Sequence, residues 1–149
     1  MPRRVVTAND QAGRSYILHD EEVAESEKWR TWGEAPLGLE LAELLPSSSP
    51  DLEPPAGGSR ATFVTLPPWA EMREEVAGGG FHGLDKDGFH RTRTIDYVMI
   101  VSGELELVLD EGRTTVGPGD IVVQRNTSHA WYNHGTEPVT FWGVMVSAA

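Results

Sequence analysis

The chain has 149 residues, 39% of them hydrophobic, which is enough for one folded domain with a core but not for two. Its 12 basic and 23 acidic residues give a net charge of −11, which repels phosphate groups and anionic lipids, so nucleic acid and membranes are not expected partners. The sequence has no cysteine, so disulfides and thiolate metal sites are excluded. Any metal ligand must therefore come from His, Asp or Glu.

The N-terminus lacks the features of a targeting segment. It carries two arginines, Arg3 and Arg4, but no apolar stretch of the length that a secretion signal requires. No other segment approaches the roughly 20 apolar residues of a membrane span. We therefore expect a cytoplasmic protein.

In the N-terminal part, short β-rich runs predict strands at residues 4–7, 15–19 and 60–66. The segment LGLELAELL, between the last two, fits a short helix and a strand equally well. Residues 46–58, PSSSPDLEPPAGG, predict an exposed loop, because this composition buries too little apolar area to offset the entropy of ordering.

A two-turn helix is predicted at residues 69–77. Prolines precede it, Trp69, Met72 and Val76 recur at helical spacing, and glycines follow it. The helix and the glycines lead into the polar segment GFHRTRTIDY at 88–97, so we interpret them as a lid over that segment.

The C-terminal part alternates short β-rich runs with turn sequences and shows no helical period. The runs lie at 95–101, 104–110, 113–116, 120–124, 129–133 and 138–146. Six short strands joined by tight turns are typical of an antiparallel sandwich or barrel. We expect one all-β domain over 1–149, in which 88–149 form the core and 1–87 add strands and loops that complete the barrel or a dimer.

The polar side chains in GFHRTRTIDY fall on one face of an extended strand. Because side chains alternate between faces, His90, Thr92 and Asp96 point to the same side. Val98 and Ile100 continue that face as an apolar floor of a substrate pocket.

The segment HAWYN repeats this alternation, with His129, Trp131 and Asn133 on one face. If the two strands are neighbours, His90, Asp96 and His129 converge on one point. Two histidines and a carboxylate with open positions form the facial triad used for Fe(II) and other divalent metals.

These two segments resemble the paired metal-binding motifs of the cupins, a family of small jelly-roll barrels. In the first motif His90 takes the place of the first histidine, Thr92 that of the second and Asp96 that of the glutamate, and Gly103 closes it. In the second, Gly119 opens the motif, His129 takes the place of the histidine and Asn133 follows. The interval from Gly119 to His129 is one residue shorter than in the motif, and QRNT replaces its proline and glycine.

The resemblance extends from Gly88 to about Val146. The chain is also similar to a subgroup of single-domain cupins that carry H-R-T-x-T-x-D-Y and Q-R-x-T-x-H-A-W, in which threonine and aspartate are the usual residues. The resemblance implies a cupin-type jelly-roll β-barrel with an irregular acidic N-terminal extension and one short helix. It also implies one divalent metal ion, Fe, Mn, Zn or Ni, and a homodimer.

Other residues have a functional and a structural interpretation. Asp96 is either a direct ligand or a general base beside the metal. Thr92 contacts substrate or is an ordinary strand residue, and Trp131 and Asn133 belong to the predicted pocket. His82 either supplies a replacement ligand or lies in a solvated loop. Arg125 either anchors a substrate carboxylate or forms a rim salt bridge.

The expected function is that of a small-molecule enzyme that uses the metal as a Lewis acid on a carboxylated, phenolic or polyketide-like substrate. The reaction would be a decarboxylation, dehydration, cyclisation or isomerisation, the work of a lyase or isomerase. A non-heme iron dioxygenase is the alternative within the enzyme class, and a metal-free ligand-binding or sensor cupin is the alternative outside it.

Overall fold

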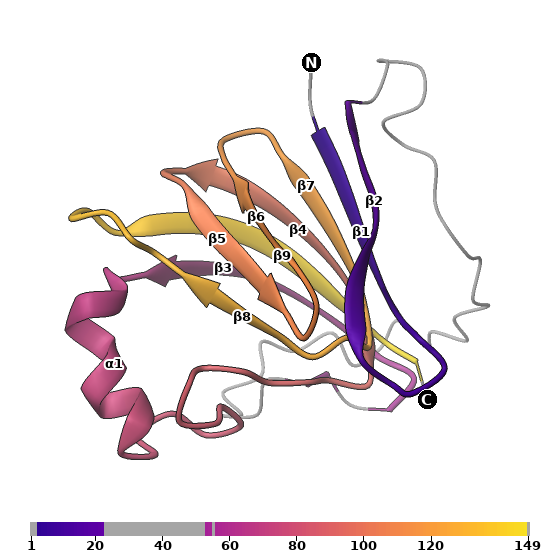
Figure 1. Cartoon of the computed structure of the whole chain (residues 1–149), viewed down its shortest axis with the longest axis horizontal. Helices are drawn as coiled ribbons and strands as arrows, with labels where there is room; N and C mark the ends of the chain where they lie inside the picture. Colours follow the sequence, from indigo (N-terminus) through magenta and orange to yellow (C-terminus); the bar gives the residue numbers. More distant parts are fainter. Residues whose placement is uncertain (1–2, 23–52, 55, 149) are drawn as a thin grey trace.

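A computed structural model describes residues 3–22, 53–54 and 56–148 (Figure 1). The segment LGLELAELL and residues 46–52 of the predicted loop lie outside this range. The described part contains nine strands and one helix. In chain order they are β1 Arg3–Asn9, β2 Ser15–Glu22, β3 Ser59–Leu66, α1 Trp69–Ala77, β4 Thr94–Ser102, β5 Leu105–Leu109, β6 Arg113–Val116, β7 Ile121–Arg125, β8 His129–Tyr132 and β9 Val139–Ser147.

The strands form two sheets. One has six strands in the order β2-β1-β7-β4-β9-β3, and the other has three in the order β6-β5-β8. All neighbouring pairs are antiparallel except β1 and β7, which run parallel. The N-terminal strands therefore extend the sheet whose centre is built by β4, β7 and β9.

The core lies between the two sheets, where inward-facing apolar residues of several strands meet. Along β4 the alternate residues Val98 and Ile100 are buried, while Met99 and Val101 are exposed on the opposite face. The core cluster consists of Val5, Val98, Ile100, Leu105, Leu107, Leu109, Val116, Val122 and Val139. The predicted apolar floor at Val98 and Ile100 is therefore part of the packed core.

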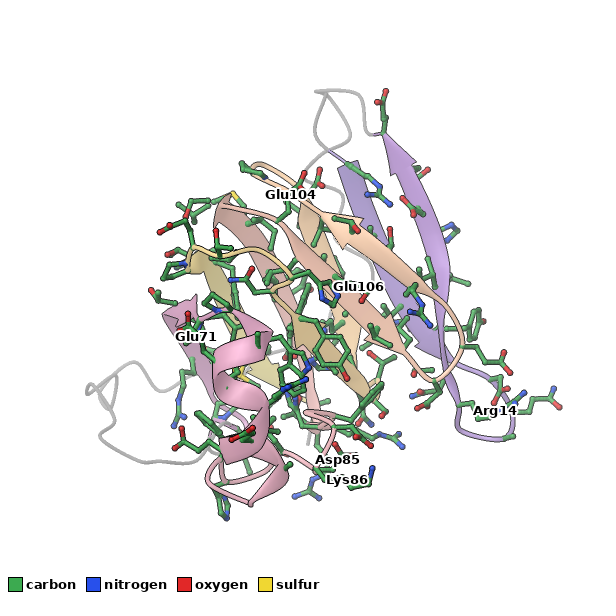
Figure 2. The ribbon with its side chains drawn as sticks, turned by 60° about the vertical axis from the view of Figure 1, so that its left-hand side comes forward. Arg14, Glu71, Asp85, Lys86, Glu104 and Glu106 are labelled. Carbon is green, nitrogen blue, oxygen red and sulfur yellow. The ribbon has the colours of Figure 1, made fainter. Side chains whose placement is uncertain are left out.

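Helix α1 packs against one end of the smaller sheet. It buries Met72 and Val76, and its first residue, Trp69, lies against Tyr132 of β8 with ring centroids 4.7 Å apart. The backbone N–H of Trp69 also donates to the carbonyl of Asn133 at 2.7 Å. In Figure 2, Asp85 and Lys86 mark the loop that follows the helix and leads to His90.

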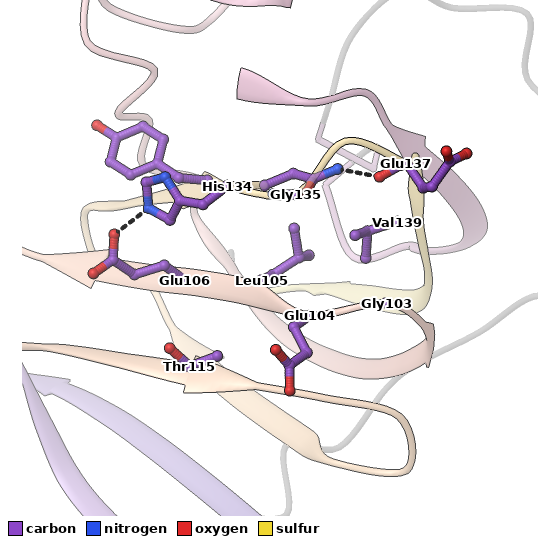
Figure 3. A pocket seen from close by; sticks show the side chains of 11 residues that line it. Gly103, Glu104, Leu105, Glu106, Thr115, His134, Gly135, Glu137 and Val139 are labelled. Atoms are coloured by element: carbon purple, nitrogen blue, oxygen red, sulfur yellow. Dashed lines mark hydrogen bonds and ion pairs between the residues drawn. The ribbon is translucent and has the colours of Figure 1, made fainter. Parts of the chain in front are cut away.

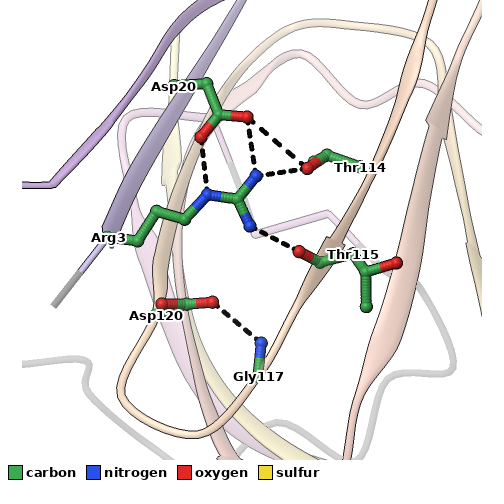
Figure 4. A network of polar contacts seen from close by, with 6 residues as sticks. All are labelled: Arg3, Asp20, Thr114, Thr115, Gly117 and Asp120. Atoms are coloured by element: carbon green, nitrogen blue, oxygen red, sulfur yellow. Dashed lines mark hydrogen bonds and ion pairs between the residues drawn. The ribbon is translucent and has the colours of Figure 1, made fainter.

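A polar network fastens the β1–β2 hairpin to β6 (Figure 4). The Arg3 guanidinium donates to both carboxylate oxygens of Asp20 at 2.6 Å, to Thr114 Oγ1 at 2.5 Å and to the Thr115 carbonyl at 2.6 Å. The pKa of Asp20 is lowered by the hydrogen bond from Arg3. One arginine thus connects the six-stranded sheet to an edge strand of the smaller one.

The structure confirms every predicted strand in the described range and the helix at Trp69–Ala77. One local difference matters for the site. The strand expected to run without interruption from His90 begins only at Thr94, and His90 forms an isolated bridge with His129. Within the described residues, the structure contains no helix with the length and apolar composition that a membrane span needs.

Candidate functional site

Two histidines from distant parts of the chain lie side by side between the sheets. The backbone N–H of His90 donates to the carbonyl of His129 at 3.0 Å, and the reciprocal bond has the same length. This bridge holds the two imidazole rings with their centroids 4.3 Å apart and tilted by 58°. The expectation that the two segments are neighbours is thus confirmed for this pair.

The imidazole of His129 is held in one orientation. Its Nδ1 lies 2.9 Å from the carbonyl oxygen of Thr127, and because a carbonyl only accepts, Nδ1 must carry the proton. The lone pair of the neutral ring is then on Nε2. His129 is 2% exposed, and burial, reinforced by the neighbouring His90, lowers its pKa to about 3. The ring is therefore neutral at physiological pH.

His90 is less buried than its neighbour, and burial also lowers its pKa. Its Nδ1 is enclosed and makes no hydrogen bond within the described part of the chain. Both members of the pair are therefore neutral imidazoles, which is the form that binds metal ions.

Asp96 lies on β4 at the end of a chain of buried hydroxyl groups. Thr94 Oγ1 donates to Asp96 Oδ1 at 2.5 Å, and Thr92 Oγ1 lies 2.7 Å from Thr94 Oγ1. Because Thr94 donates its one hydroxyl proton to Asp96, it can only accept in the second bond, and Thr92 is the donor there. All three residues are at most 5% exposed. Burial raises the pKa of Asp96 to about 6, although the hydrogen bond from Thr94 opposes the shift.

The structure brings together the two histidines but does not add Asp96 to them as a third donor. Among residues 3–22, 53–54 and 56–148, no three His, Asp or Glu side chains are grouped so that they could hold one metal ion. Asp96 belongs to the six-stranded sheet, between Gln124 of β7 and Met145 of β9. The predicted three-ligand set stays a prediction, and the pair supplies two of its members.

Gln124 is a polar residue of this region that the sequence reasoning did not single out. It is in register with Asp96 and is 2% exposed. Its side-chain Nε2 has no hydrogen-bond partner in the described structure. The available signal was its position in DIVVQ, where alternation places Val122 and Gln124 on the same inward face.

The other predicted pocket residues take different places. Trp131 lies edge-on to His129 with ring centroids 6.2 Å apart, and it stacks on Phe141 at 5.9 Å. Asn133 is buried but its amide is fully used. It donates to the carbonyls of Leu66 and Glu137 and accepts from the N–H of Gly135. Its side chain therefore fixes the turn between β8 and β9.

Arg125 and His82 are both exposed. Arg125 is in register with Ile95, and because its neighbour Gln124 is buried, it points to the opposite face of β7. His82 lies in the loop after α1. Neither is brought to the histidine pair by the described contacts, so their proposed roles as anchor and replacement ligand stay predictions.

A separate groove lies on the outside of the smaller sheet (Figure 3). It has a volume of about 540 Å³, and its lining includes Glu104, Glu106, Tyr132, His134 and Glu137. His134 Nε2 lies 2.8 Å from Glu106 Oε2, on the face opposite the buried leucines of β5. Asn133 is the one predicted site residue in its lining.

Comparison with known proteins identifies the family. The model of the cupin domain matches residues 73–147. The chain is 47% identical over 85 residues to phomopsin biosynthesis cluster protein C' of Diaporthe leptostromiformis, which is 56% of this chain and 41% of that protein. It is 49% identical over 53 residues to the cupin-domain-containing oxidoreductase srdD of Neurospora crassa, which is 33% of this chain and 27% of that protein.

The chain thus spans less than half the length of these curated relatives. Among solved structures, it is similar to a cupin 2 conserved barrel domain protein from Salinispora arenicola, with 17% identity and a TM-score of 0.45 over 70% of this chain and 72% of that one. Because the family model covers half of the chain, in the region that contains both histidine segments, the chain belongs to the cupin family.

Proposed function

We propose that this cupin is a small-molecule enzyme of secondary metabolism in which His90 and His129 bind one divalent metal ion and Asp96 transfers a proton. The observation that carries the proposal is the pair of neutral imidazoles, His129 buried and His90 partly buried, whose centroids are 4.3 Å apart. The proposed substrate is a carboxylated or phenolic, polyketide-like molecule.

The donor chemistry of the pair fits a metal ion. Histidine ligands commonly donate their second ring N–H to a carbonyl, which fixes the tautomer and directs the other nitrogen at the metal. The bond from His129 Nδ1 to the Thr127 carbonyl is of this kind. When bound, the ion would supply Lewis-acid polarisation of a substrate oxygen.

Asp96 has the properties of a general acid–base group. A carboxyl with a pKa of about 6 is largely ionised at pH 7, yet it is a stronger base than an ordinary aspartate. Its Oδ1 is held by Thr94, so the carboxyl has a fixed orientation. In the proposed reaction Asp96 moves a proton at the carbon next to a substrate carbonyl. In an isomerisation it removes the proton and returns it at another atom, and in a cyclisation it removes the proton so that the carbon forms the ring bond. In a dehydration it removes the proton and passes it to the departing hydroxyl group, which leaves as water, and in a decarboxylation it delivers a proton to the carbanion left by the loss of carbon dioxide.

The names of similar proteins support a role in secondary metabolism and favour oxidoreduction as a second reaction class. Two relatives are named as phomopsin biosynthesis cluster proteins, which supports a role in secondary metabolism. Three others are named cupin-domain-containing oxidoreductases. An oxidoreductase, including a dioxygenase, is therefore the second candidate. A substrate screen run with and without oxygen separates a dioxygenase from the lyase or isomerase, since a dioxygenase turns over only with oxygen.

Metal content tests the proposal directly. The untagged protein, reconstituted separately with Fe(II), Mn(II), Zn(II) and Ni(II), should retain about one ion per chain in at least one case. His90→Ala and His129→Ala should each abolish retention, whereas His134→Ala should not, because His134 is an exposed partner of Glu106.

Absence of stoichiometric metal in the wild-type protein after all four reconstitutions would refute metal binding. A metal-free ligand-binding cupin would then explain the protein better than a metal-dependent enzyme. Equal retention by the wild type and His129→Ala would refute the assignment of the ligands.

A further inference from the structure

Gln124 presents to the interior a hydrogen-bond donor that has no partner in the described part of the chain. The residue is 2% exposed, and its Nε2 makes no hydrogen bond to any described group. Leaving such a donor unpaired destabilises the folded state, because the group loses its hydrogen bonds to water and gains none in return. Buried polar groups are nearly always paired, so an unpaired one calls for a partner that is added when the protein works.

Asn133 differs from Gln124 in that its buried side-chain amide is hydrogen-bonded. Asn133 is equally buried, at 2% exposure, and its amide makes three hydrogen bonds to the backbone, two within its own turn and one to the Leu66 carbonyl at the end of β3. Gln124 is on a regular strand, where the backbone groups around it are already engaged with β4. The Gln124 side chain therefore does not stabilise a turn as the Asn133 side chain does.

The neighbours of Gln124 define what it can recognise. Asp96 is its partner in register on the inward face, and Asp96 Oδ1 already accepts from Thr94. An amide Nε2 only donates, so its missing partner is an acceptor atom such as a carbonyl oxygen. Aromatic surface is available in the same interior, because Trp131 and Phe141 stack at 5.9 Å and pack against the core.

We propose that Gln124 donates a hydrogen bond from Nε2 to a carbonyl oxygen of an aromatic ketone or related small molecule bound between the sheets. This inference rests on the proposed function, because it concerns the substrate of the same site. It assigns Gln124 as a residue that positions the substrate carbonyl beside Asp96.

The test is an NMR titration that observes the side-chain amide of Gln124 directly. The chain has two glutamines, Gln11 and Gln124, and Gln11 lies exposed in the turn between β1 and β2. The full chain is labelled with ¹⁵N at its glutamine side chains and kept metal-free with a chelator. The Gln11→Met variant then leaves a single side-chain amide signal, that of Gln124. The probes are acetophenone and its carbonyl-free analogue ethylbenzene.

Acetophenone should shift the Gln124 amide signal saturably, and ethylbenzene should not. Gln124→Met removes the donor at similar volume and should weaken acetophenone binding by about three- to tenfold, the worth of one neutral hydrogen bond. Gln11→Met should bind like the wild type. The unfolding temperature of Gln124→Met should equal or exceed that of the wild type, because an unpaired buried donor has been removed.

Three results would overturn the inference: no shift with acetophenone at millimolar concentration, equal shifts with both probes, or unchanged affinity in Gln124→Met. If Gln124→Met does not fold, the titration of the Gln11→Met protein decides alone. Failure of metal binding would refute the proposed function without changing this result, because the titration is carried out without metal.

Discussion

His90 and His129 face each other across an isolated antiparallel bridge, with two backbone hydrogen bonds of 3.0 Å and imidazole centroids 4.3 Å apart. The bridge holds the pair through the main chain, so its position does not depend on the imidazoles themselves. Replacing one histidine should therefore leave the backbone of the other in place, which makes single variants of the pair informative.

His129 should make the protein sensitive to mild acid. Its folded pKa of about 3 lies below the ordinary value of 6.5, so only the unfolded chain takes up a proton in this interval. The contribution of the neutral His129 to the free energy of unfolding is complete above pH 6.5. It decreases as the pH drops, by about 2 kcal/mol at pH 5. Urea unfolding of the chelated wild type and of a His129→Asn variant at pH 5 and pH 8 isolates this loss, because the opposite change from Asp96 is common to both proteins.

The matched variants are His129→Asn, which should reduce the acid sensitivity, and His134→Asn at the exposed histidine, which should preserve it. Identical pH dependence of unfolding in the wild type and His129→Asn would contradict the assignment of a neutral buried His129.

Asp96→Asn should stabilise the chelated protein at neutral and alkaline pH. The folded pKa of Asp96, about 6, lies above the ordinary value of 3.8. The contribution of Asp96 to the free energy of unfolding is therefore most favourable below pH 3.8 and is lost as the pH rises through 6. The neutral asparagine avoids this loss, which amounts to at most about 3 kcal/mol. The gain over the wild type should therefore grow between pH 4 and pH 8.

Thermal unfolding at these two pH values checks the prediction, with the exposed Asp87→Asn as the control. A stability difference that stays constant with pH would show that Asp96 ionises as readily in the folded as in the unfolded chain.

Gly103→Ala should destabilise the fold much more than Gly13→Ala. Both glycines have positive φ, +77° and +81°, so alanine costs each about 1 kcal/mol in backbone strain. A Cβ at Gly103 would also lie 2.6 Å from Cγ2 of the buried Val139, whereas nothing lies within 4 Å at Gly13. The clash should add roughly 1–3 kcal/mol, measured by urea unfolding. Equal losses in the two variants would rule out the predicted clash.

Asp20→Asn should weaken the attachment of the β1–β2 hairpin to β6. About a third of each side chain of the Arg3–Asp20 pair is exposed, so solvent screening limits the loss to about 1 kcal/mol at pH 7. Because the pKa of Asp20 is lowered, its contribution is present at neutral pH and disappears as the pH falls through that lowered pKa.

Urea unfolding at pH 7 and pH 3 tests this, and Asp87→Asn in the more exposed Lys86–Asp87 pair serves as the control with no measurable loss. A loss at pH 3 as large as that at pH 7 would contradict the assigned ion pair.

Asp85→Ala should loosen the loop that leads to His90. Asp85 Oδ1 accepts from the backbone N–H groups of Asp87 at 2.9 Å and Phe89 at 2.8 Å. Without these bonds, amide hydrogen exchange at Asp87 and Phe89 should become at least several-fold faster, because each bond protects one of these amides. Lys86→Ala, which leaves both bonds intact, is the control. Unchanged exchange in Asp85→Ala would show that the loop is held without the carboxylate, by the backbone bonds of Asp85 with Phe89 and Gly88 and by the Tyr132 hydroxyl bond to the Asp87 carbonyl.

The sequence determined the local structure and the placement of side chains on faces. The alternation in β4 and β8 predicted which residues point inward, since it needs only the two-residue period of an extended chain. The prolines and glycines around residues 69–77 predicted the helix bounds in the same way. The paired histidine segments also identified the family, which the match over 73–147 confirmed.

Tertiary structure alone decided which inward residues meet. His90 crosses to β8 and contacts His129, whereas Asp96 stays between β7 and β9, so the two ends of one short segment belong to different sheets. It also paired the Asn133 amide in a turn and left Gln124 Nε2 without a partner among the described residues, although both residues follow the same inward alternation. The reason is physical: alternation is a property of one strand, but the partners of a buried polar group come from strands distant in sequence.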